Sequence, residues 1–162
     1  MCGIVGITSN KEVTTRIINS LKKLEYRGYD SAGIATLKNG YINEVKCEGR
    51  VEALEKNVSK TNLQGDIGIG HVRWATHGKP SHVNAHPHSS EKVSVVHNGI
   101  IENSTILKKI LEKKGYKFKS QTDTEVIAHL VTDYLKKNNL KDTIIKVLKK
   151  LHGSFALGII FK

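Results

Sequence analysis

The sequence predicts a layered α/β or α+β sheet protein, with several strands and long helices between them. Short runs rich in β-branched residues and glycine alternate with longer segments whose apolar residues recur at helical spacing. The chain has 162 residues, of which 38% are hydrophobic and 25% charged. This composition is typical of a soluble globular protein, and the length gives one domain room for a sizeable core.

Six runs have the residues typical of strands and are predicted to pair into sheets. They are residues 2–8, 32–38, 41–47, 67–73, 93–97 and 154–161. Asn39 and Gly40 separate the second run from the third, and this dipeptide favours a two-residue hairpin turn.

Four segments carry an apolar stripe at helical spacing and are predicted to be helices. They are residues 13–24, 106–111, 122–135 and 144–151. Gly115 is expected to end the second helix and Gly153 the fourth. Thr122 and Glu125 form a capping-box pattern at the start of the third.

The formal net charge of +11 raises the question of nucleic-acid binding. Base recognition favours arginine forks, but every basic residue except Arg16, Arg27, Arg50 and Arg73 is a lysine. No motif of a nucleic-acid-binding module is present. The sequence therefore favours a solvated lysine surface and no nucleic-acid partner.

No apolar run approaches the ~20 residues that span a bilayer, and the apolar start CGIVGI is too short for a signal peptide. A cytoplasmic protein without a membrane partner is expected. Cys2 and Cys47 have no metal-type spacing, and a disulfide is not expected in a reducing compartment.

Cys2 stands directly behind the initiator methionine, in the stretch MCGIVGI. Removal of Met1 would leave a thiol and a free α-amine on one residue, so that a nucleophile carries its own base. The alternative is a small hydrophobic residue that begins a buried strand.

Two further stretches carry residues suited to anion binding. In YRGYDSAGIA (26–35), Arg27 can hold a carboxylate or pair with Asp30. In HVRWATHGKPSHVNAHPH (71–88), Arg73 can clamp a carboxylate through its bidentate fork. Trp74, the one tryptophan of the chain, is either a lid over a ligand or a core residue.

Five histidines fall between residues 71 and 88, namely His71, His77, His82, His86 and His88. Imidazole is a good zinc ligand, but no pair has the spacing of a recognisable helical zinc motif. The sequence therefore predicts no metal site.

Asn98-Gly99, in VSVVHNGIIEN (93–103), is a hairpin signal between apolar runs. Alternatively, the Asn98 amide and the backbone N–H of Gly99 form a pair of donors for an oxyanion. In SQTDTEVIAHL (120–130), Asp123 either caps a helix or receives a cationic amine.

Together these parts suit a free α-amino acid whose side chain has a reactive carbonyl. A thiol with its own base, two oxyanion donors, a cation for a carboxylate and an anion for an ammonium group are all available. L-Glutamine is the obvious candidate substrate.

The five stretches MCGIVGI, YRGYDSAGIA, HVRWATHG, VVHNGIIEN and SQTDTEVIAHL occur in this order along essentially the whole chain. With them the sequence resembles the N-terminal glutaminase domain of the glucosamine-6-phosphate synthase family, the isomerising glutamine–fructose-6-phosphate aminotransferases. These are class II glutamine amidotransferases. The resemblance implies an α+β fold, the four-layer αββα sandwich of N-terminal nucleophile (Ntn) hydrolases.

The resemblance also implies roles for individual residues. Cys2 would be the nucleophile, its freed amine the general base, and Asn98 with Gly99 the oxyanion hole. Arg73 would hold the carboxylate of glutamine and Asp123 its amine. The remaining substrate-binding residues would be Trp74, Thr76 and His77 of a covering loop, and His86 nearby. No cofactor or metal is implied.

Members of this family are longer, because two sugar-isomerase domains that bind fructose 6-phosphate follow the glutaminase domain. The resemblance therefore implies that residues 1–162 are a truncated glutaminase domain, incomplete at its C-terminal end. The apolar strand 154–161 would then have an unpaired edge, and association into a homo-oligomer is expected. The alternative to an active glutaminase is an inert fragment or a glutamine-binding remnant of a split gene.

Overall fold

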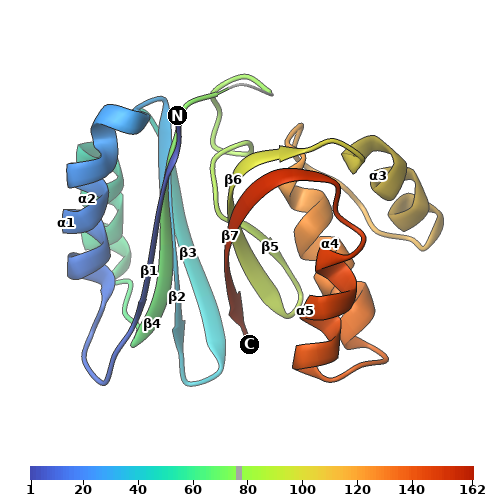
Figure 1. Cartoon of the computed structure of the whole chain (residues 1–162). Coiled ribbons are helices and arrows are strands. Elements are labelled where there is room, and N and C mark those ends of the chain that lie inside the picture. Colours follow the sequence, from blue (N-terminus) through green and yellow to red (C-terminus); the bar gives the residue numbers. More distant parts are fainter. Residues whose placement is uncertain (76–77) are drawn as a thin grey trace.

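The computed structural model describes residues 1–75 and 78–162, and it contains two antiparallel sheets that lie face to face (Figure 1). The first sheet has the strand order β1-β4-β2-β3, formed by Gly3–Thr8, Ile67–Arg73, Ser31–Lys38 and Tyr41–Glu48. The second has the order β5-β6-β7, formed by His88–Ser90, Val93–Ile101 and Gly153–Phe161.

Helices cover the outer face of each sheet (Figure 1). The first sheet carries α1 (Thr14–Leu24) and α2 (Val51–Thr61), and a short 3-10 helix, η1 (Glu25–Arg27), follows α1. The second sheet carries α3 (Ser104–Lys113), α4 (Thr124–Leu135) and α5 (Leu140–Leu148). The four layers are therefore helix, sheet, sheet and helix, which confirms the predicted αββα sandwich.

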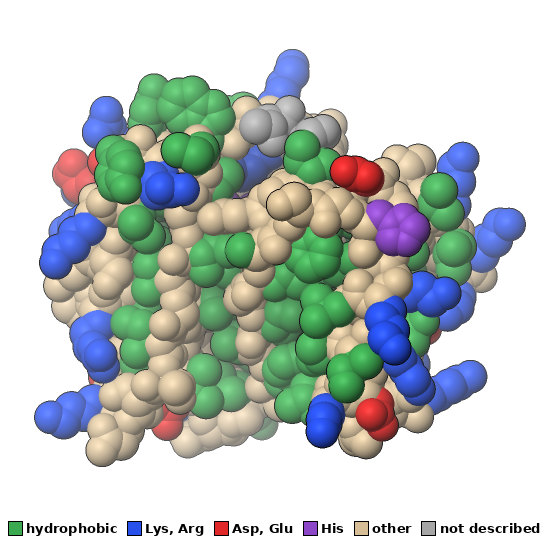
Figure 2. All heavy atoms as spheres, in the orientation of Figure 1, with side chains coloured by type: hydrophobic (Ala, Val, Ile, Leu, Met, Phe, Trp, Pro, Cys, Tyr) green, Lys and Arg blue, Asp and Glu red, His purple; other side chains and the backbone are tan. Residues whose placement is uncertain are grey.

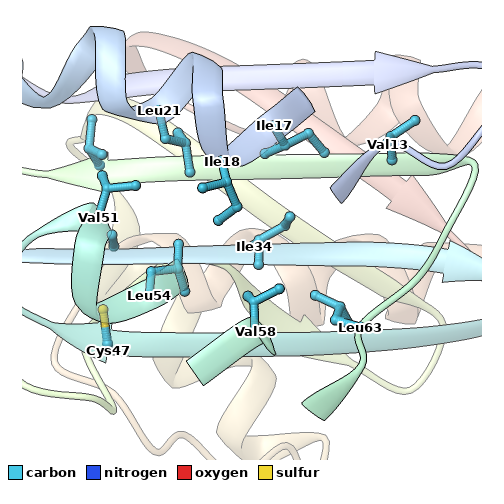
Figure 3. Packing of buried hydrophobic residues seen from close by; sticks show 12 residues of the cluster. Val13, Ile17, Ile18, Leu21, Ile34, Cys47, Val51, Leu54, Val58 and Leu63 are labelled. Carbon is cyan, nitrogen blue, oxygen red and sulfur yellow. The ribbon is translucent and has the colours of Figure 1, made fainter. Parts of the chain in front are cut away.

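The hydrophobic core has three parts, one for each interface between layers. Between α1, α2 and the first sheet, Ile17, Leu21 and Ile34 are fully buried (Figure 3). Gly70 of β4 allows this close packing, because a Cβ atom there would lie 2.5 Å from Cγ2 of Ile17. A second cluster lies between the second sheet and α3–α5.

The third cluster joins the two sheets. Ala35, Ile69, Val96 and Ile160 are buried in it. Side chains alternate between the two faces of a strand, so Ile34 of β2 packs towards the helices and Ala35 towards the other sheet. This alternation determines which polar side chains at the strand ends point between the sheets.

Most predicted elements are present, with shifted boundaries. All six predicted strands and four predicted helices form, and Asn39 and Gly40 make the predicted hairpin turn with φ of 50° and 78°. The sequence prediction missed α2 and the three-residue strand β5. The capping-box prediction was wrong, because the Glu125 carboxylate accepts from the backbone N–H groups of Lys119 and Ser120.

Hydrophobic side chains are visible across the centre of one face of the molecule, and lysine and arginine side chains surround them (Figure 2). Part of the apolar surface is a hollow of about 420 Å³ between α5 and β7. Its lining residues are Ile144, Val147, Leu148, Phe155, Leu157 and Ile159. Along the described chain, β7 pairs with β6 alone, so its other edge is open. No described helix has the length and apolar character needed to cross a membrane.

We expect the 162-residue chain to associate through this surface, because an open strand edge beside an apolar hollow favours pairing with another chain. Leu148→Lys should shift the association to higher protein concentration in sedimentation velocity experiments. Ile106→Lys on α3 is the matched control, since Ile106 is 63% exposed and lies outside the hollow. Monomeric wild-type protein at all concentrations would contradict this expectation.

Candidate active site

The pairing of β1 with β4 places Cys2 at one end of the first sheet. Gly3 pairs with Val72 in this antiparallel ladder, so Cys2 lies opposite Arg73 and Trp74. The backbone N–H of Trp74 donates to Sγ of Cys2 at 3.3 Å, and Sγ lies 3.6 Å from the Trp74 carbonyl oxygen. The thiol is half-buried and therefore open to a ligand.

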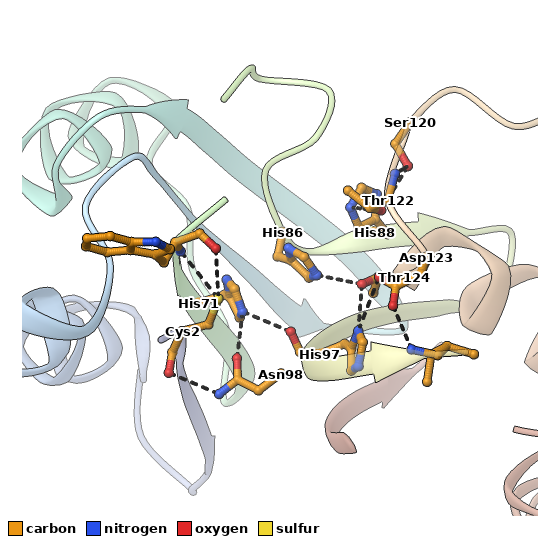
Figure 4. Close-up of polar contacts among 12 residues, drawn as sticks. Cys2, His71, His86, His88, His97, Asn98, Ser120, Thr122, Asp123 and Thr124 are labelled. Atoms are coloured by element: carbon orange, nitrogen blue, oxygen red, sulfur yellow. Dashed lines mark hydrogen bonds and ion pairs between the residues drawn. The ribbon is translucent and has the colours of Figure 1, made fainter. Parts of the chain in front are cut away.

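The carbonyl oxygen of Cys2 accepts two further hydrogen bonds. Nε of Arg27 donates at 3.0 Å and Nδ2 of Asn98 at 3.2 Å (Figure 4 shows the Asn98 bond). From the sequence, Arg27 could either bind a substrate carboxylate or pair with Asp30. In the structure, Asp30 instead accepts from the backbone N–H of Ala75 and from Oγ of Ser31. Arg27 therefore holds the backbone of Cys2 in place.

Asn98 and Gly99 lie inside β6, where they pair with Ala156 and Phe155 of β7. The hairpin interpretation of this dipeptide was therefore wrong. Gly99 has a φ of 119°, and a Cβ atom there would lie 2.1 Å from the carbonyl oxygen of Ser154. Only glycine fits this conformation and this spacing. Both residues line a hollow of about 500 Å³ together with Cys2 and Trp74.

A second, smaller recess of about 30 Å³ lies beside this hollow. Cys2, Trp74 and Gly99 line both cavities. The recess also contains the other predicted site residues that the structure describes, Arg73, His86 and Asp123. Thr76 and His77 lie outside the described residues. The recess has the volume of about one water molecule, so glutamine needs the neighbouring hollow as well.

Two residues of opposite charge lie in the recess. Arg73 is 4% exposed, and its Nη2 donates to the carbonyl oxygen of Gly78 at 3.2 Å. Asp123 occupies the N-cap position of α4 but makes no side-chain cap bond there. Its Oδ2 accepts from the N–H of Ile101 at 2.8 Å, and Oδ1 lies 3.7 Å from Nδ1 of His97.

Trp74 lies over the site and not in the core, because its side chain is 46% exposed. Its ring meets the edge of the Tyr29 ring, with 5.5 Å between the ring centroids. This position agrees with the lid interpretation of Trp74 and excludes the core interpretation.

Buried histidines lie beside the recess, and His86 and His97 line it. His71 and His86 stack with ring centroids 4.2 Å apart, and Oγ1 of Thr124 lies within hydrogen-bond distance of both His86 and His97 (Figure 4). Burial lowers the pKa of His71 to about 4 and that of His88 to about 3. Burial also lowers the pKa of His86 well below its ordinary value. These three imidazoles are therefore neutral at pH 7.

Among the described residues, no group of three histidine, cysteine, aspartate or glutamate side chains has an arrangement that could hold a metal ion. The buried histidines instead bond to hydroxyl, amide and carbonyl groups, which is the usual way to satisfy buried polar atoms.

Two contacts of the site could not be derived from the sequence. Arg27 meets Cys2 across 25 positions, and His71 meets Asn98 across 27 positions. The sequence singled out Arg27 for anion binding and His71 only as one of five histidines considered for zinc. The packing of η1 and of the two sheets brings them to Cys2 and Asn98.

The glutamine amidotransferase domain family matches residues 71–162. This chain belongs to the glutamine amidotransferase family. It is 56% identical over 162 residues to the isomerising glutamine–fructose-6-phosphate aminotransferase of Clostridium acetobutylicum, covering 99% of this chain and 26% of that protein. The corresponding protein of Bradyrhizobium diazoefficiens is 52% identical, with 99% and 27% covered. The chain thus spans about a quarter of the length of these relatives.

Solved structures of amidotransferases have the same fold. Glutamine phosphoribosylpyrophosphate amidotransferase from B. subtilis superposes with a TM-score of 0.85 at 31% identity, covering 99% of this chain and 35% of that chain. An allosteric regulatory enzyme of purine biosynthesis gives a TM-score of 0.87, also at 31% identity, with 99% and 35% covered. Identity to the fructose-6-phosphate aminotransferases is higher, as the sequence motifs predicted.

Glu125 stabilises the turn before α4 in this amidotransferase domain. Its carboxylate accepts from the N–H of Lys119 at 2.9 Å and from the N–H and Oγ of Ser120 at 2.6 and 2.7 Å. Burial alone would raise the pKa of Glu125, but His129 and these donors lower it to about 2. The ionised carboxylate therefore stabilises the segment that carries Asp123.

Glu125→Gln should lower the free energy of unfolding at pH 7 by roughly 3 kcal/mol, as a shift from 4.5 to about 2 implies. The folded-state pKa is depressed, so this stabilisation is present above pH 4.5 and is lost as the pH falls towards 2. Denaturant unfolding between pH 7 and 2.5 should show a flatter pH profile for the variant. Glu112→Gln, at an exposed carboxylate, is the control. Parallel profiles for wild type and Glu125→Gln would contradict this role.

Proposed function

We propose that this domain hydrolyses the side-chain amide of L-glutamine with Cys2 as nucleophile. The proposal is carried by one arrangement. Cys2 and Gly99 line both the hollow that Asn98 also lines and the recess that contains Arg73 and Asp123, and the Asn98 amide donates to the Cys2 carbonyl oxygen. A thiol beside two oxyanion donors suits attack on an amide carbonyl.

In the proposed reaction, Sγ bonds to the amide carbon and the thiol proton passes to the α-amine of Cys2, which removal of Met1 would free. The N–H groups of Asn98 and Gly99 receive the oxyanion. The carbon–nitrogen bond then breaks as the amine returns the proton to the leaving ammonia. Water hydrolyses the thioester and releases glutamate.

The recess suits the α-carboxylate and α-ammonium groups of glutamine, which do not change during the reaction. The Arg73 guanidinium would bind the α-carboxylate and the Asp123 carboxylate the α-ammonium group. Trp74, with Thr76 and His77 of the same segment, would cover the substrate. His86 supports the pocket from its buried position beside Thr124.

The ammonia would serve the conversion of fructose 6-phosphate to glucosamine 6-phosphate in the cytoplasm. This proposal rests on the relatives named isomerising glutamine–fructose-6-phosphate aminotransferases, of which the chain spans about a quarter. We place the sugar chemistry outside these 162 residues, so the chain alone would act as a glutaminase on L-glutamine. The proposed glutaminase reaction requires no nucleic acid, membrane, cofactor or metal.

A diazoketone analogue of glutamine should alkylate Cys2, because an activated thiol reacts where an ordinary one does not. Mass spectrometry of the intact protein should show one adduct on a chain that lacks Met1. Peptide mapping should find the adduct on Cys2 and none on Cys47, whose burial raises the pKa of its thiol. Cys2→Ala should remain unmodified. Absence of labelling on correctly folded wild-type protein would favour an inert glutamine-binding remnant.

Arg73→Ala and Asn98→Ala should affect different kinetic constants. The carboxylate of glutamine does not change during the reaction, so loss of Arg73 should raise KM more than it lowers kcat. Loss of one oxyanion donor should lower kcat by ~10²–10³ with KM nearly unchanged. Steady-state ammonia release measures both constants, and the reverse pattern would contradict the two assignments.

A further inference from the structure

His71 lies on β4 and contacts the proposed oxyanion donor Asn98. Its side chain is fully buried. Nε2 of the imidazole lies 3.0 Å from Oδ1 of Asn98 and 3.1 Å from the carbonyl oxygen of His97 (Figure 4). Nδ1, the other ring nitrogen, has no hydrogen-bond partner in the described part of the chain.

These contacts determine which nitrogen carries the proton. The backbone carbonyl oxygen of His97 can only accept, so Nε2 must donate, because an unprotonated nitrogen there would face that oxygen without a hydrogen. A proton on Nδ1 instead would leave that N–H buried and unbonded, at a cost of ~1–3 kcal/mol. Burial lowers the pKa of His71 to about 4, so the ring carries one proton near neutral pH.

The orientation of the Asn98 amide follows from this tautomer. Oδ1 accepts from His71, while Nδ2 donates to the carbonyl oxygen of Cys2 at 3.2 Å. Rotation of the amide by half a turn would bring Oδ1 against the Cys2 carbonyl oxygen and Nδ2 against the Nε2–H group. Two favourable contacts would become two unfavourable ones.

We propose that His71 is a positioning residue, which holds the Asn98 amide with its N–H groups towards Cys2 and its oxygen away from it. The effect of this orientation on catalysis rests on the proposed function. Nδ2 has two hydrogens, and the Cys2 carbonyl engages one of them. The other is then available to an oxyanion formed at the carbon that Sγ attacks. A reversed amide would present an oxygen to that negative charge.

The alternative is that His71 only fills space between the sheets. Its ring stacks on His86, and Ile69 two residues earlier belongs to the cluster between the sheets. A space-filling role predicts that any residue of similar volume suffices. A positioning role requires a donor at the place of Nε2. Glutamine can supply that donor, whereas leucine fills the space without one.

Kinetics of His71→Gln and His71→Leu separate the two roles. Leucine should lower kcat by ~10- to 100-fold, less than removal of the donor itself, with KM changed less than about threefold. Glutamine should restore kcat to within about fivefold of wild type. In an Asn98→Ala background, His71→Leu should change kcat by less than about twofold, because its effect passes through Asn98.

His129→Leu is the control for loss of another buried imidazole, since His129 lies on α4 and packs against Tyr116 and Phe118. His129→Leu should change kcat by the same factor in the wild-type and the Asn98→Ala backgrounds. An equal factor for His71→Leu in the two backgrounds, or equal kcat for the leucine and glutamine variants, would overturn the positioning role.

NMR spectra of the ¹⁵N-labelled wild-type protein test the geometry without any reaction. Long-range ¹H–¹⁵N correlations should show His71 protonated at Nε2 alone at pH 7. The side-chain amide resonances of Asn98 should move in His71→Leu and return towards wild type in His71→Gln. A proton on Nδ1, or unchanged Asn98 resonances, would overturn the proposal. Wild-type protein that passes this test but releases no ammonia would contradict the proposed function instead.

Discussion

The packing of the two sheets against each other is the constraint on which the site depends. Cys2 directly precedes β1 of the first sheet and Asn98 lies in β6 of the second, and the bond between them exists because the sheets lie face to face. Small and β-branched side chains such as Ala35 and Val96 fill the layer between them. A change in the spacing of the sheets would break the bond between the Asn98 amide and the Cys2 carbonyl oxygen.

Strand alternation explains why polar chemistry occurs at one end of this apolar layer. Ile69, His71 and Arg73 share a face of β4 because they are two residues apart. Ile69 packs in the inter-sheet cluster, His71 reaches Asn98, and Arg73 lies in the recess. Along this face of β4 a hydrophobic side chain is thus followed by a hydrogen-bonding one and then by a charged one, at three alternate positions. Val96 and Asn98 repeat the change on β6.

The sequence was sufficient for the fold class, which depends on local patterns and on the resemblance. It also named Cys2, Arg73 and Asp123, which the structure brings together around one recess. It left Asn98-Gly99 open between a hairpin turn and a pair of oxyanion donors. No turn forms there, because β6 continues through the dipeptide and pairs with β7. Arg27 and His71 were visible as candidates, but their partners lie 25 and 27 positions away. Such contacts depend on how η1 and the two sheets pack together, which no local pattern in this chain specifies. The helix α2 was missed although Val51, Leu54 and Val58 carry its buried stripe.

Asn98 and Gly99 differ in how directly their identities indicate chemistry. Gly99 is required by packing alone, because its positive φ and its contact with Ser154 exclude any side chain. The glycine would be needed here even in a protein without catalytic activity.

Asn98 is half-exposed, and strand pairing with Ala156 places no demand on its side chain. Its amide nevertheless bonds to the backbone of the cysteine on one side and to a buried imidazole on the other. A buried histidine loses solvation to make that bond, and the fold obtains no apolar packing from the amide in return. The arrangement of Asn98 and His71 is therefore the part of the site that packing explains least and chemistry explains best.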